Sequence, residues 1–143
     1  MDMEIKRKLM QPFIVAKKIY SDDQEQITEP KEIRQVISPK TANDLAKMLV
    51  NVVDNGHGNQ AQINGYNIAG KTGTAEVPNP DTSGYSDETV HTFVGFAPAF
   101  DPEFAILVKL DKPIGVSWAA TSVTPVFREI AEYLLNYFEI PPQ

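Results

Sequence analysis

The chain contains no cysteine, no long apolar segment and no extended run of basic residues. Without cysteine it can form no disulfide, no thiolate zinc site and no cysteine nucleophile. No apolar run approaches the roughly 18 residues of a membrane-spanning helix, and the N-terminus lacks the apolar core of a signal peptide, so we expect no targeting segment in this chain. The net charge of −6 would repel a polyanion, so we expect no nucleic-acid partner.

The chain has 143 residues, which suit one domain, and its 11 prolines and eight glycines predict short elements. Phe13–Tyr20 is rich in β-formers, and a polar stretch separates it from a second such segment, residues 33–38. These two segments predict a strand pair with a solvated connection.

Two helices are predicted from their capping residues and apolar periodicity. Ser38 and Pro39 fit the N-cap and first helical position of a helix that Gly56 would end in a left-handed conformation. Thr124 and Pro125 predict the start of a final helix. The apolar faces comprise Ala42, Leu45, Ala46, Leu49, Val52 and Val53 in the first helix, and Phe127, Ile130, Ala131, Leu134, Leu135 and Phe138 in the second.

Thr92–Ala97 and Phe104–Leu110 predict a hairpin, because a turn containing Pro98, Asp101 and Pro102 separates them. The second strand is almost entirely apolar, so we expect it to be buried on both faces. Antiparallel strands with segregated helices define an α+β fold, a sheet with helices packed against it.

The stretch "GYNIAGKTGTAEV", residues 65–77, matches two motifs of different function. From Gly65 it fits the phosphate-loop pattern G-x-x-x-x-G-K-[ST], which requires a buried strand before it and a helix directly after it. The preceding residues are too polar for that strand, and Gly73, Pro78 and Pro80 oppose the helix. A nucleotide-binding function is therefore the less favoured interpretation.

From Lys71 the same stretch reads K-T-G-T, which suits an extended strand. Gly70 and Gly73 would leave room for a ligand close to the backbone. A lysine with neighbouring threonine hydroxyls can bind a carboxylate through charge and directed hydrogen bonds. The alternative is that Lys71 is an exposed lysine on an edge strand and has no function.

Over most of its length the sequence resembles the C-terminal part of the transpeptidase domain of class B penicillin-binding proteins, which are monofunctional D,D-transpeptidases. The matching segments occur in the order of that family: "LMQPFIV", "SPKTANDLAKML", "GYNIAGKTGTAEV", "FVGFAPAFDP" and "PVFREIAEYLLNY". K-T-G-T alone is a moderate signal, and the flanking segments strengthen it. Residues 1–143 are thus expected to be a C-terminal segment of such a domain.

The resemblance implies roles for individual residues. Lys71 would line the cleft and attract the substrate carboxylate, which Thr72 and Thr74 would bind through their hydroxyls, with Gly73 between them. The Thr74 backbone N–H would be one oxyanion-hole donor. Trp118 and Tyr85 would lie near the border of the cleft. The implied ligands are peptidoglycan stem peptides and β-lactams, with no metal or organic cofactor.

The family's other two motifs are absent from this sequence. None of the six serines has Lys three residues later, as in S-x-x-K, or Asn two residues later, as in S-x-N. The nucleophile would then lie in an N-terminal half of the domain, and this chain would be inactive alone. That half is an expected partner. We also expect self-association, because the strands that cover Phe104–Leu110 in the family are missing here.

Several alternatives remain open from the sequence. The chain could be a non-catalytic split or degenerate paralogue that binds a partner. A β-lactamase or β-lactam sensor also carries K-T-G, although "FVGFAPAFDP" favours the penicillin-binding enzymes. By resemblance the full-length protein would act at the extracytoplasmic face of the bacterial membrane, in division or in elongation.

Overall fold

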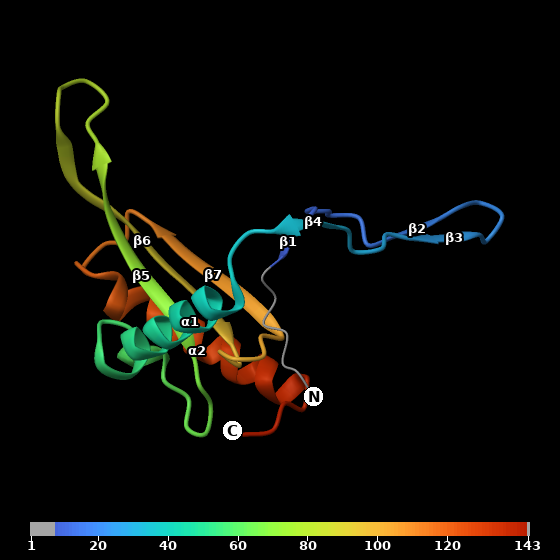
Figure 1. Cartoon of the computed structure of the whole chain (residues 1–143). Helices are drawn as coiled ribbons and strands as arrows, with labels where there is room; N and C mark the ends of the chain where they lie inside the picture. Colours follow the sequence, from blue (N-terminus) through green and yellow to red (C-terminus); the bar gives the residue numbers. More distant parts are fainter. Residues whose placement is uncertain (1–7, 143) are drawn as a thin grey trace.

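The computed structural model describes residues 8–142 and has the expected α+β architecture. A three-stranded antiparallel sheet consists of β5 (Ala69–Pro78), β6 (Tyr85–Ala97) and β7 (Phe104–Asp111), with β6 in the middle. Two helices pack against it, α1 (Pro39–Asn55) and α2 (Ala119–Tyr137), and a short 3₁₀ turn, η1 (Asn59–Ala61), follows α1. Figure 1 shows α1 in front of the sheet and α2 behind it.

The two helices cover opposite faces of the sheet, as the strand alternation requires. On one face Phe93 of β6 meets Phe127 of α2 with the ring centroids 4.7 Å apart, and both side chains are fully buried. On the other face Ala69 and Phe96 pack with Val50 of α1. The sheet is therefore held from both sides close to the start of β5.

The first helix begins where the sequence predicts, and the cap is formed. The Thr41 N–H donates to Ser38 Oγ at 3.1 Å, and Pro39 is the first helical residue. The C-terminal prediction is right in position and wrong in conformation, because Gly56 has φ −115°. Glycine is needed there for space, since a Cβ would lie 2.8 Å from the Val52 carbonyl oxygen.

The last helix begins six residues earlier than predicted, with Trp118 as the N-cap and Ala119 as the first helical residue, where Thr124 and Pro125 were expected. Pro125 lies inside the helix and removes one backbone hydrogen bond. The helix persists because Ala119, Val123 and Phe127, spaced four residues apart, are all fully buried on one face. The burial of these three side chains outweighs the tendency of a Thr-Pro pair to begin a helix.

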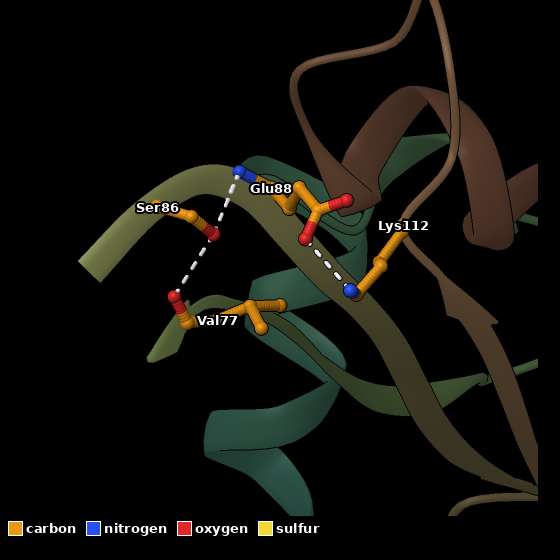
Figure 2. Close-up of polar contacts among 4 residues, drawn as sticks. All are labelled: Val77, Ser86, Glu88 and Lys112. Atoms are coloured by element: carbon orange, nitrogen blue, oxygen red, sulfur yellow. Dashed lines mark hydrogen bonds and ion pairs between the residues drawn. The ribbon is translucent and has the colours of Figure 1, made fainter. Parts of the chain in front are cut away.

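β6 begins seven residues before the strand predicted at Thr92–Ala97, and residues 79–84 form the tip of the hairpin that joins it to β5. Tyr85 begins β6 and pairs with Pro78. Figure 2 shows the reason: Ser86 Oγ donates to the Val77 carbonyl at 3.0 Å and accepts the Glu88 N–H at 3.3 Å. This hydroxyl links the two strands where the register shifts between Glu76 and Pro78.

The prediction that Phe104–Leu110 is buried on both faces is wrong. β7 is an edge strand, and its side chains alternate between half-buried and exposed. Phe104, Ile106 and Val108 pack against the core, whereas Leu107 is 65% exposed. In sequence this edge strand looks like a strand buried on both faces, because an apolar residue, Leu107, occupies one of its exposed positions.

The N-terminal strand pairing also differs from the prediction. The segment at 33–38 supplies β4 (Glu32–Gln35), which pairs with β1 (Lys8–Met10). Lys17–Ile19, β2, pairs with β3 (Glu25–Ile27), which lies inside the stretch predicted to be a solvated connection. Both ladders extend away from the sheet in Figure 1. Within residues 8–142, no helix is both long enough and apolar enough to span a membrane.

Candidate active site

The K-T-G-T motif lies on β5, at an open edge of the sheet. Lys71 pairs with Val94 and Thr72 pairs with Phe93 on β6. The strand continues to Pro78 without a helix, so the phosphate-loop interpretation is wrong. Alternation places Thr72 and Thr74 on the sheet face that α2 covers and Lys71 on the opposite face.

The backbone of Thr72 faces outward at this edge. Lys71 Nζ donates to the Thr72 carbonyl oxygen at 2.8 Å, so this carbonyl does not point toward β6. The Gly73 carbonyl accepts the Thr92 hydroxyl of β6 at 3.4 Å and points inward. Because backbone directions alternate along a strand, the N–H and C=O groups of Thr74 also face outward. The edge is thus able to pair with an extended ligand.

Thr74 is joined to the start of α2. The Ala119 N–H, the first of that helix, donates to Thr74 Oγ1 at 3.2 Å. The N-cap residue Trp118 makes no capping bond with its own side chain, so Thr74 supplies the cap from another element. Since Oγ1 accepts from the helix, the hydroxyl proton remains available to a bound acceptor.

A pocket of about 530 Å³ lies between the β5 edge and the first turn of α2. Lys71, Thr72 and Thr74 line it from the strand. The helix N-terminus adds positive potential, and among the lining residues within 8–142 Lys71 is the one Lys or Arg side chain, so the pocket suits an anion. The remaining lining residues are His57, Trp118, Ala119, Ala120 and Thr121.

The structure separates the two aromatic residues expected near the cleft. Trp118 lines this pocket and is 66% exposed. Tyr85 does not line it and lies at the distal end of the hairpin, opposite Pro78. His57, which sequence reasoning did not place at the site, lines it because the turn after α1 comes close to β5.

The two glycines of the motif lie close to side chains of the neighbouring strand. A Cβ on Gly70 would lie 2.4 Å from Phe93 Cζ, so the space that this glycine leaves is filled by a core ring and is not open to a ligand. A Cβ on Gly73 would lie 2.5 Å from Thr92 Oγ1. Both glycines thus permit close approach of β6 side chains to β5.

The loop between β7 and α2, which leads to Trp118, is attached to β6 by two contacts. Lys112 Nζ forms an ion pair with Glu88 at 2.7 Å, and the Lys112 N–H donates to the Thr89 carbonyl at 3.0 Å (Figure 2 shows the ion pair). The hydrogen bond to Glu88, followed by its charge, raises the pKa of Lys112 above its ordinary value.

In this α+β fold a lysine and two hydroxyls on an open strand lie beside a helix N-terminus, an arrangement that suits an anionic group such as a carboxylate. The model of the penicillin binding protein transpeptidase domain matches residues 3–132. The chain therefore belongs to the penicillin-binding-protein transpeptidase family.

Relatives and solved structures agree with this assignment. Penicillin-binding protein PbpB of Mycolicibacterium smegmatis is 42% identical over 122 residues, covering 78% of this chain and 19% of that protein. Stage V sporulation protein D of Bacillus subtilis is 33% identical over 111 residues, covering 77% of this chain and 17% of that protein. Penicillin-binding protein 3 of Mycobacterium tuberculosis, solved with ampicillin, superposes with a TM-score of 0.79 at 34% identity, covering 90% of this chain and 31% of that one. The chain thus spans about a fifth of the length of the first curated relatives.

Proposed function

We propose that this chain is the C-terminal segment of the transpeptidase domain of a serine D,D-transpeptidase that cross-links peptidoglycan stem peptides and is acylated by β-lactams. One observation carries the proposal: the open β5 edge places Lys71, Thr72 and Thr74 in one pocket with the N-terminus of α2. Relatives named as peptidoglycan D,D-transpeptidases or penicillin-binding proteins support it.

In this proposal the segment forms one wall of the active site. The substrate, or a β-lactam, lies along the β5 edge with its carboxylate between the Thr72 and Thr74 hydroxyls and near the Lys71 ammonium. The outward Thr74 N–H donates to the developing oxyanion. Removing one such donor slows a serine acyl transfer by roughly a hundredfold to a thousandfold.

The nucleophile is proposed to lie outside these residues. The S-x-x-K and S-x-N motifs have no match in this sequence. A covalent acyl-enzyme would form on a serine of the adjoining part of the polypeptide, which would complete the cleft opposite β5. By the same family argument the complete enzyme acts at the extracytoplasmic face of the membrane.

The test is acylation of the full-length polypeptide that contains this chain. It is incubated with penicillin, digested, and mapped by mass spectrometry. We expect one stoichiometric, hydroxylamine-sensitive adduct on a serine outside residues 1–143, and slower acylation by the Lys71→Ala variant. The absence of any adduct would favour the alternative, a non-catalytic paralogue. An adduct on a serine within this chain would refute the assignment of this segment as one wall of the site.

A further inference from the structure

A buried hydrogen-bonded group lies directly behind Thr74. His91 of β6 is its cross-strand partner, and the His91 side chain has no exposed surface. His91 Nε2 and Thr89 Oγ1 share a hydrogen bond of 2.9 Å, and His91 Nδ1 and Ser122 Oγ share one of 2.8 Å. With a partner on each nitrogen, the imidazole is held in one orientation.

Ser122 extends this network into the first turn of α2. Its hydroxyl donates to the Trp118 carbonyl at 3.2 Å. Trp118 directly precedes Ala119, whose N–H donates to Thr74. His91 on β6 is thus linked, through Ser122 and the start of α2, to Thr74 on β5, which is the cross-strand partner of His91.

The aromatic contact between α2 and the sheet lies beyond the first turn of the helix. Phe127, which packs on Phe93, lies roughly two helical turns beyond Ala119. Of the side chains buried beneath the first turn, Ala119 and Val123 contribute only apolar packing. Packing of this kind does not set the direction of the Ala119 N–H, whereas a directed hydrogen bond does.

We infer that His91 is a positioning residue of the carboxylate-binding pocket. It fixes the first turn of α2 against β6, and so holds the Ala119 N–H on Thr74 and the Trp118 ring at the rim of the pocket. What the pocket binds rests on the function proposed above. Because His91 has no exposed surface, it acts through these residues and does not touch the ligand.

The first test is a double-mutant cycle in the full-length protein, read out as the second-order rate of acylation by a β-lactam. His91→Phe keeps a ring and removes both nitrogens, and Ser122→Ala breaks the same link without altering the buried ring. Each should slow acylation about threefold to tenfold alone, and by less than twofold in a Thr74→Val background, because the bond that they position is then already lost. An equal effect in both backgrounds would overturn the inference.

Phe127→Leu is the matched control. It reduces packing on the same helix without touching the hydrogen-bonded network. We expect it to lower the melting temperature at least as much as Ser122→Ala does, and to slow acylation by the same small factor whether position 74 is Thr or Val. Coupling of Phe127→Leu to Thr74→Val as strong as that of His91→Phe would indicate that His91 is only a packing residue.

The second test does not depend on acylation. The protein is labelled with 5-fluorotryptophan, and Trp118→Phe assigns its ¹⁹F resonance. We expect His91→Phe and Ser122→Ala to shift or broaden this resonance and Phe127→Leu to leave it nearly unchanged. A wild-type protein that is not acylated would refute the proposed function, whereas an unchanged Trp118 resonance in both network variants would refute the role of His91.

Discussion

Replacing Thr74 with valine tests two roles of its hydroxyl, as the cap of α2 and as a donor to a bound carboxylate. Valine keeps the shape of the side chain and removes Oγ1, which accepts the Ala119 N–H at 3.2 Å. Losing a helix cap costs about 1 kcal/mol of folding stability. If the same hydroxyl also donates to a bound carboxylate, a hydrogen bond to a charged group worth roughly 1.5–3 kcal/mol disappears. That loss corresponds to acylation slowed about tenfold to a hundredfold.

The assay pairs stopped-flow acylation of the full-length protein with its thermal unfolding. Thr74→Ser is the control, because serine keeps the hydroxyl and should retain most of both the rate and the stability. The two readouts separate the roles, since a cap alone would lower the melting temperature without slowing acylation. Wild-type acylation by Thr74→Val, or an equal loss in Thr74→Ser, would refute the carboxylate-binding role of Thr74.

Three further predictions follow from the fold and the sequence. The isolated 143-residue chain should gain no mass with penicillin, because it has no S-x-x-K serine, and an intact-mass adduct would contradict this. The isolated chain should also self-associate and show more than its monomer mass in size-exclusion light scattering, because β7 is an apolar edge strand. Leu107→Lys should reduce this association. A monomeric parent chain would contradict the prediction. Gly70→Ala should lower stability by about 1–2 kcal/mol, because the added Cβ overlaps the Phe93 ring. This loss should shrink in a Phe93→Leu background, and equal losses in both backgrounds during thermal unfolding would show that the overlap is not the cause.

The parts of the fold that could be predicted were those with local signals. The Ser38 cap and the Pro39 start of α1 depend on neighbouring residues only, and both are present in the structure. The extended K-T-G-T strand was also predicted, because prolines and glycines after it exclude a helix. Trp118 was placed near Lys71 by resemblance, and both line one pocket.

The predictions that were wrong concern features that depend on contacts between residues far apart in the chain. The start of α2 at Ala119 is stabilised by the Thr74 hydroxyl, which is 45 residues away in the chain, so no local cap was visible. The strong local signal of Thr124 and Pro125 was therefore misleading. Similarly, β3 lies in a polar stretch because a two-stranded ladder with exposed side chains needs no apolar pattern.

The packing around the two glycines could not be predicted for a related reason. Only the register of β5 against β6 brings Phe93 under Gly70 and Thr92 beside Gly73. From sequence, the same glycines were equally compatible with a ligand lying close to the backbone. Tyr85 was placed near the cleft by resemblance, and the extension of β6 to residue 85 was not visible in the sequence because it depends on the Ser86 link to Val77.

In the proposed function the β5 edge and the start of α2 together bind a carboxylate. The crystal structure of the full-length protein acylated by a β-lactam tests this directly. We expect the carboxylate of the bound β-lactam to lie within about 3 Å of the Thr72 and Thr74 hydroxyls, with the Ala119 N–H still donating to Thr74. An acylated protein whose ligand carboxylate contacts other residues and leaves the β5 edge free would contradict it.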